Sequence, residues 1–349
     1  IDAGKNTIRE EKIIHEKENV FTFPLEKRPH NVVVDPDVFV LKAMNTIKPR
    51  DMWMHQLAHD PHVVHRISAA LNLALIAGED ELLALENALK NDSFWGVRAE
   101  IATALGSTKL PLAFEKVKRA YVKEKDARAK QIMLRVLGDS ASPELAPFFI
   151  EQTKVANSYL IPAEAYRSLG KIRDAKVLSA LEKGLHSPSW IDMIAAGAVT
   201  GMTSLQTQEA FERLTKLVHP RYSNRIRQTV AAGLGTIGKG RERAVDVLMD
   251  LMKDDYINLQ ISAAAALGEL GNARAIPALE ELQKGRRDPR LARTAMESIR
   301  KINGVLELAP TKKEQNEKKS EEELALQRMR RKKLPRLVRT TNQRARSNK

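Results

Sequence analysis

The chain contains no cysteine and few aromatic residues, and these scarcities narrow its class. With no cysteine among 349 residues, disulfide bonds and thiolate metal sites are excluded. Aromatic residues make up 5% of the chain and hydrophobic residues 43%, which is typical of a helix-rich globular protein. No apolar run reaches the roughly 18 residues that a membrane-spanning helix needs, and no signal-peptide pattern opens the sequence. We therefore expect a cytoplasmic protein. Because the first residue is Ile1, we also expect a fragment or a processed product.

The positive charge is concentrated at the C-terminal end. Of the net charge of +14, residues 311–349 contribute +9, from 14 Lys/Arg and 5 Glu. The stretch "RMRRKKLPR" within this tail could bind nucleic acid or another polyanion through phosphate contacts, or it could simply be solvated. It has no aromatic residue for base stacking, so base-specific recognition is not expected. The candidate polyanion-binding residues are Arg328, Arg330, Arg331, Lys332, Lys333 and Arg336.

One motif recurs along most of the chain. An aliphatic residue closes an alanine-rich stretch about every 32 residues, and the unit around Val199 is less regular. The recurring positions are Leu73, Leu105, Leu137, Leu169, Leu234, Leu267 and Ile299. A fixed period of this length is the signature of a repeat protein. We count eight units.

Each unit predicts two helices. The stretch "ISAAAALGEL" at 261–270 is rich in alanine, the strongest helix former. An amphipathic segment follows the alanine-rich one in each unit. In "AVDVLMDLM" at 244–252, for example, Val245, Leu248, Met249 and Met252 recur at the three- and four-residue steps of one buried helical face. The sequence around "VRAEIATALG" resembles HEAT repeats, the helical-hairpin solenoid family, over residues 60–303. This resemblance implies a stack in which neighbouring pairs complete one core.

The stretch "AAGLGTIGKGRE" at 231–242 contains a G-x-G-x-x-G pattern that could suggest phosphate binding. A phosphate-binding loop of this kind follows a β-strand, whereas this one follows the helical pattern "IRQTVAA". Gly240 also stands where a P-loop has a serine or threonine. Gly235 matches Gly106, Gly138 and Gly268 in the repeat, where we expect glycine to end a helix in the left-handed conformation. The prediction is a loop that ends a helix, without nucleotide.

Residues 1–45 lack the helical period. "NVFTFPL" alternates and "NVVVDPD" is β-branched and ends in a turn, so both stretches predict strands. So few residues make a poor independent core. We interpret them as the last strands of a β-sandwich.

The junction between this segment and the helices resembles the aminopeptidase N family of zinc metallopeptidases. The matching residues are Phe21, Phe23, Pro24, Leu25, Val32, Asp35, Pro36, Val40, Leu41 and Lys42, followed by Gln56, Leu57, Asp60, Val63 and Arg66. The resemblance implies a helical domain that packs over a catalytic domain and limits peptide access, with zinc held in that upstream domain. This chain lacks H-E-x-x-H, because Asn19 replaces the second histidine in "HEKEN". It should therefore be inert alone.

Four of the eight histidines lie in "HQLAHDPHVVHR". His55 and His59, four residues apart, could share a helical face and bind a divalent ion, although solvated histidines would give the same pattern. Asp60-Pro61 should break the helix before His62 and His65. The carboxylates are spread over predicted helix surfaces and indicate no catalytic pair.

Together these patterns predict an all-α protein, a right-handed α-solenoid of about eight HEAT-like helix pairs at residues 46–305. A β-sandwich remnant at 1–45 precedes it, and a basic tail at 306–349, disordered or partly helical, follows. The first functional hypothesis is the aminopeptidase N-like helical domain. The alternative is a non-catalytic scaffold that binds a protein partner on the concave face of the solenoid, similar to a transcription-factor subunit, with a polyanion-binding tail.

Overall fold

The structure, a computed structural model, confirms an α-solenoid of HEAT-like helix pairs. It describes residues 1–4, 7–284 and 288–304. In these ranges sixteen α-helices form eight successive pairs, and short 3-10 turns precede α7, α9, α10 and α15. The helices are α1 (Arg50–His59), α2 (Val63–Ile76), α3 (Glu79–Asn91), α4 (Trp95–Ser107), α5 (Pro111–Lys123), α6 (Ala127–Asp139), α7 (Ala146–Gln152), α8 (Leu160–Lys171), α9 (Leu178–Gly184), α10 (Met193–Leu205), α11 (Gln208–Lys216), α12 (Asn224–Ile237), α13 (Glu242–Leu251), α14 (Ile257–Leu270), α15 (Ile276–Lys284) and α16 (Pro289–Ile302).

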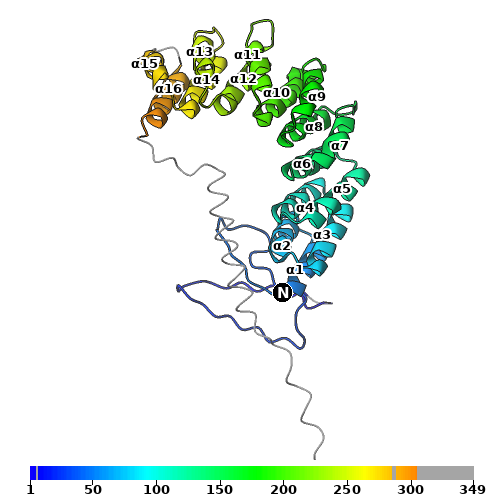
Figure 1. The fold of residues 1–349 in the computed structure, drawn as a ribbon. Coiled ribbons are helices and arrows are strands. Elements are labelled where there is room, and N and C mark those ends of the chain that lie inside the picture. Colours follow the sequence, from blue (N-terminus) through cyan, green and yellow to red (C-terminus); the bar gives the residue numbers. More distant parts are fainter. Residues whose placement is uncertain (5–6, 285–287, 305–349) are drawn as a thin grey trace, which may run out of the picture. The chain divides into compact units, whose positions relative to one another are not determined.

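The helices form two rows that differ in spacing (Figure 1). The even-numbered helices from α2 to α16 pack closely on one another, whereas neighbouring odd-numbered helices beyond α5 touch little. A stack with unequal rows bends toward the closely spaced row. The even row therefore lines the concave face of the array at residues 50–304.

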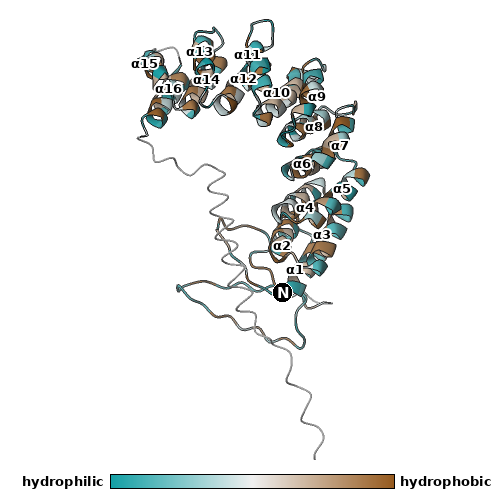
Figure 2. Ribbon diagram, in the orientation of Figure 1, coloured by the Kyte–Doolittle hydropathy of each residue, from teal (hydrophilic) through white to brown (hydrophobic). Residues whose placement is uncertain are grey.

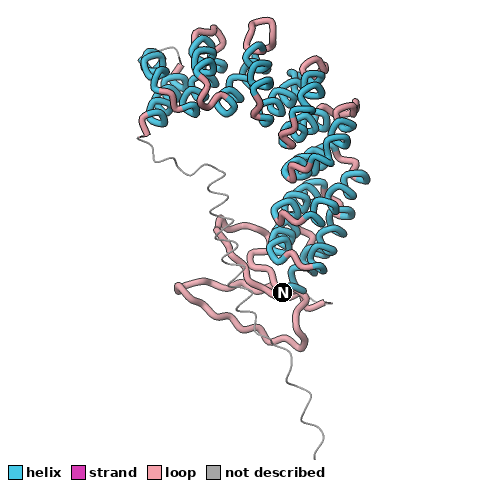
Figure 3. The backbone as a smooth tube through the Cα atoms, in the orientation of Figure 1, coloured by secondary structure: helices cyan, strands magenta, loops and turns pink. Residues whose placement is uncertain are grey.

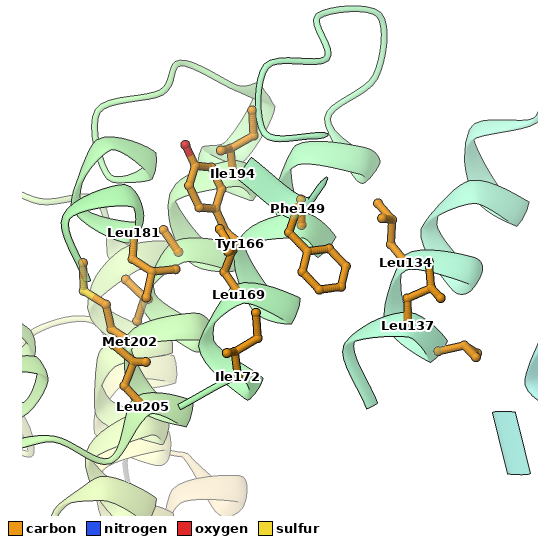
Figure 4. Close-up of a cluster of buried hydrophobic side chains, with 14 of the residues drawn as sticks. Leu134, Leu137, Phe149, Tyr166, Leu169, Ile172, Leu181, Ile194, Met202 and Leu205 are labelled. Carbon is orange, nitrogen blue, oxygen red and sulfur yellow. The ribbon is translucent and has the colours of Figure 1, made fainter. Parts of the chain in front are cut away.

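The core lies between the two rows and runs continuously along the array. Each helix carries both hydrophobic and hydrophilic residues (Figure 2), and the hydrophobic ones from successive pairs join in one cluster. Around α8, for example, Phe149, Tyr166, Leu169 and Leu181 are all nearly inaccessible to solvent (Figure 4). No pair could bury these side chains alone, which is why the fold depends on stacking.

The repeated glycines do not end helices, which corrects the expectation from the sequence. Gly106, Gly138, Gly235 and Gly268 lie inside α4, α6, α12 and α14. A β-carbon on Gly138 or Gly268 would come within 2.5–2.9 Å of a serine on the next even helix. These glycines are therefore present to let neighbouring helices approach. The stretch at 231–242 is accordingly α12 and its end, and it follows no strand, as predicted.

The closest approach joins α8 to α10. A β-carbon on Gly170 would overlap the backbone of Gly201, and one on Gly197 would overlap the backbone of Ala163. The two helices thus meet backbone to backbone at two levels, with no side chain between them.

Arginines with little solvent exposure join the first repeats to one another. Arg66 donates to Asp92, with nitrogen–oxygen distances of 2.7 and 3.1 Å, and Arg98 donates in the same way to Glu124 at 2.6 and 2.8 Å. Arg98 also donates to the carbonyl of Asp92 at 2.7 Å. Burial alone would raise the pKa of Glu124, but the hydrogen bonds from Arg98 and two backbone amides lower it. Each arginine therefore ties together two loops at the same end of the stack.

Residues 1–45 form no β-sandwich, so the predicted strands were wrong. In the described part of this range the chain is loop (Figure 3), with only isolated bridges from Asp2 to Thr7 and Asn31. Strands are stable only when other strands satisfy their backbone groups and cover one face. The described residues provide no such sheet for the alternating residues.

A buried charge cluster joins α3 to α5. Glu86 accepts hydrogen bonds from Lys116 and from Lys90, the latter at 2.7 Å, and lies 3.4 Å from Arg119. Burial acts to raise the pKa of Glu86, but the two lysines outweigh it and lower the pKa to about 2. The carboxylate therefore stays charged well below its ordinary pKa of 4.5.

We predict that Gly170→Ala lowers the free energy of unfolding by about 2 to 3 kcal/mol, because the added methyl group overlaps backbone. Gly235→Ala is the control, and we expect it to lose less stability. Its β-carbon would lie 3.0 Å from Ala266, so only a small shift of that neighbour is needed. Urea unfolding followed by circular dichroism measures both. If both variants gained stability, as helix propensity alone favours, close packing would not be the role of these glycines.

We also predict that the Glu86 cluster loses its stabilising effect in acid. The folded-state pKa lies below the ordinary value, so the contribution is complete above pH 4.5 and falls as the pH drops toward 2. Glu86→Gln should remove about 1 to 3 kcal/mol at pH 6 and less at pH 3. The measurement is the urea midpoint at both pH values. Glu79→Gln, an exposed carboxylate on the same helix, should not reproduce this difference.

Candidate partner-binding surface

The predicted histidine pair lies on α1, and the helix ends where the sequence indicated. α1 ends at His59 and α2 begins at Val63, so Asp60 and Pro61 separate the two histidine pairs. The rings of His55 and His59 are 4.6 Å apart between centroids. His65 instead pairs with Asp60 at 3.1 Å. The predicted polyanion-binding residues, Arg328 to Arg336, lie outside the described residues.

The largest concentration of exposed apolar side chains is in residues 9–47, here called the N-terminal segment. It holds 11 of the 23 large hydrophobic residues that are exposed in the described part of the chain. Val20, Phe39 and Leu41 are the most accessible, at 92%, 82% and 104%. The other exposed residues of the segment are Ile13, Ile14, Phe21, Val34, Val38, Val40, Met44 and Ile47. Exposed apolar residues, where they form a contiguous patch, are characteristic of interaction sites.

Part of the backbone of the same segment lacks hydrogen-bond partners in the backbone. Residues 9–29 make no backbone–backbone hydrogen bond to any other described residue. The carbonyl of Glu16 accepts a hydrogen bond from the Asn19 side chain at 2.6 Å. Most other backbone groups of the stretch resemble the unpaired groups at the edge of a β-sheet. Phe21, Phe23 and Leu25 keep the alternation that places every second side chain on one face.

A polar cluster fixes the segment to α1. Lys48 donates to the side-chain oxygen of Asn31 at 2.7 Å and to the carbonyl of Val32 at 3.1 Å, and it also contacts the Gln56 amide oxygen. The Lys48 ammonium lies 4.2 Å from the centre of the Trp53 ring. Burial lowers the pKa of Lys48 to about 8. Residues 31 and 32 are therefore held firmly.

A turn at Asp35 shapes the second half of the segment. The Asp35 carboxylate accepts the backbone N–H groups of Phe39 and Val40 at 3.0 and 3.1 Å and pairs with Lys42. The hydrogen bond from Lys42 is the largest cause that lowers the pKa of Asp35 to about 2. This turn presents Phe39 and Leu41 to solvent.

The even-row face differs in chemistry. Its exposed residues include Thr103 and Thr236, and several of its charges pair within the row. Lys171 binds Asp139 at 2.7 Å and Arg167 binds Glu164 at 3.1 Å. A partner on this face would have to compete with these internal ion pairs.

A surface hollow near α12 is also occupied by internal bonds. Its lining includes Arg227 and Asp254. Arg227 donates to the carbonyl of Val218 at 2.8 Å and pairs with Asp254, so these groups serve the same loop-joining role as Arg98.

Comparisons with known proteins identify the repeats. Residues 51–133 match a family model of HEAT repeats, and residues 259–285 match a model of the PBS lyase HEAT-like repeat. No curated protein matches the sequence. Among the helices that the structure describes, none is long and apolar enough to cross a membrane.

Three solved structures are similar to the chain at low identity. They are human deoxyhypusine hydroxylase in complex with glycerol (15% identity, 73% of this chain and 96% of that chain, TM-score 0.33), YibA of E. coli (18%, 72% and 92%, 0.44), and the complex of CpcE and CpcF of phycocyanin lyase from Nostoc (15%, 77% and 99%, 0.38). At these identities and TM-scores, none of their activities transfers to this chain.

The resemblance to the aminopeptidase N family was wrong. The family models that match are HEAT-type repeats, and the three similar structures are not peptidases. The motif residues from Phe21 to Lys42 lie in a loop segment and not in a β-sandwich. The expectations of a helical cap over a peptidase domain, of hydrolase activity and of zinc in an upstream domain are therefore withdrawn.

The sequence pattern of the N-terminal segment predicts strands of a β-sandwich, which the structure does not contain in the described residues. The alternation in "NVFTFPL" predicts a strand of a sandwich, whereas Val20 and Phe21 are exposed in a loop. The signal that could have located the exposed segment is the concentration of large apolar residues in a stretch with no helical period.

Proposed function

We propose that this protein is a non-catalytic HEAT-repeat scaffold that binds a protein partner. HEAT repeats are an architecture of protein interaction, because the stack presents extended surfaces. The observation that supports the proposal most strongly is the N-terminal segment, where exposed apolar side chains accompany a stretch, residues 9–29, that makes no backbone–backbone hydrogen bond to the described chain.

The partner best matched to this segment is a protein with an accessible β-sheet edge. An extended peptide that adds to a sheet gains affinity from main-chain hydrogen bonds and specificity from alternate side chains. Ile13, Val20 and Phe21 have the β-branched and aromatic types that such pairing favours. Pro24 has no N–H and would limit the paired stretch to residues before it.

The charge of the segment argues for an apolar contact. Residues 9–29 contain five Lys/Arg and five Glu, so their net charge is zero. Binding through this segment should therefore change little with salt. The polar even-row face, on the concave side, is the alternative surface for the same partner.

We predict that Val20→Asp weakens partner binding about tenfold or more without changing stability, since this side chain is 92% exposed. A photo-crosslinking residue at Leu41 in the full chain would first identify the partner in the cells of origin. The complex would then be rebuilt from purified components and its Kd measured by calorimetry.

The matched control is Leu83→Asp, because Leu83 of α3 is 53% exposed and lies outside the segment. It should bind as the original protein does. Hydrogen exchange on the complex should slow at residues 13–23. If only the even helices were protected, the N-terminal segment would not be the binding site, and the partner would lie on the concave face.

We further propose that the tail binds polyanions, on the basis of its charge of +9. Binding of a short duplex DNA should fall steeply with salt, with a slope of log K against log salt near −5 if all six candidate residues contact phosphates. Replacing the six, from Arg328 to Arg336, with glutamine should make this slope shallower by about that amount. An unchanged slope would assign the binding to other residues.

A further inference from the structure

Three groups able to bind a metal meet at the base of the N-terminal segment. Asp2, His30 and His55 each offer one ligand atom, and these atoms all lie within 4.8 Å of one another. They come from three separate parts of the chain, the first residues, the turn before Asn31 and the helix α1. The nearest pair is His55 Nε2 and Asp2 Oδ2, at 2.8 Å.

The backbone positions two of these groups together. The N–H of Asp2 donates to the carbonyl of Asn31 at 2.8 Å, and the N–H of His30 donates to the carbonyl of Asp2 at 2.7 Å. The N–H of Gly4 donates to Asp2 Oδ1 at 2.9 Å, which leaves Oδ2 directed at His55. This bond from Gly4 is the largest cause that lowers the pKa of Asp2, so the carboxylate is charged and ready to bind a cation.

The third group is positioned by α1. His55 is half-buried, and its ring lies 5.2 Å from that of His30 between centroids. A metal ion bonded to nitrogen and oxygen at about 2.0–2.2 Å brings its ligand atoms to about 3.0–3.5 Å from one another. The widest pair of ligand atoms, up to 4.8 Å apart, would have to close by about 1.3 to 1.8 Å. His30 is the exposed member of the three, and its ring contacts the ring of His55 and lies beside Gly4. His59, one turn after His55, is the nearest further imidazole.

We propose that Asp2, His30 and His55 form a binding site for a first-row divalent transition-metal ion. Two imidazoles and one carboxylate are a ligand set that such ions favour over calcium or magnesium. The ion would join residues 2 and 30 to α1 and so close the base of the N-terminal segment. The proposal does not depend on the proposed partner.

The test uses Co²⁺ and the full chain, prepared without a polyhistidine tag and treated with chelator. We expect one Co²⁺ per chain, a visible d–d absorption band, and slower hydrogen exchange at residues 1–4 and 28–31. His30→Ala and His55→Ala should weaken binding about tenfold or more, and Asp2→Asn, which keeps the side-chain shape, should weaken it as well.

His62→Ala is the control, because His62 is exposed beside α1 but outside the cluster. It should bind Co²⁺ like the original protein, and circular dichroism should show that each variant keeps its helices. Equal binding by His30→Ala and the original protein would overturn the proposal. So would a loss seen with His59→Ala but not with His30→Ala, which would assign the ion to the pair on α1 alone.

Discussion

The close approach of the even-numbered helices is the constraint on which the rest of the fold depends. Where Gly170 faces Gly201, two helices meet without any side chain between them. Nothing comparable draws the odd helices together, so the array must bend toward the even row. The core between the rows then needs large side chains on the odd helices, such as Phe149 and Phe211, to fill the space that the bend opens.

Arginines with little solvent exposure join the loops at the ends of the helices. Helices that approach at one row leave loops at their ends, and those loops carry backbone groups without helical partners. Arg66, Arg98 and Arg227 each donate to a loop carbonyl and to a carboxylate of the next repeat. Buried ion pairs are costly unless their remaining hydrogen bonds are satisfied, and here the loop provides those acceptors. Close packing of the even helices and arginine contacts between the loops both join successive repeats.

The periodicity of the sequence predicted the helix pairs, because each pair is specified by local spacing. It could not predict the role of Gly138 or Gly268, since the relevant neighbour is a serine about 30 residues away and glycine commonly ends helices. The alternation around Phe21 is a genuine β pattern, but a strand also requires a second chain segment beside it. His55 was identified by its spacing from His59. Its actual neighbours, Asp2 and His30, are brought to it by long-range folding that no local pattern encodes.

The N-terminal segment combines fixed points with a free middle. Asn31 and Val32 are held to α1 through Lys48, and Asp2 is held there through His55. Residues 9–29 between these points make no backbone pairing with the described chain. Anchoring both sides restricts the conformations that the free stretch can adopt, and less entropy is then lost when a partner orders it. A segment fixed in this way can bind more tightly than the same residues as an unanchored tail, which gives the solenoid a direct part in recognition even if the partner touches only the segment.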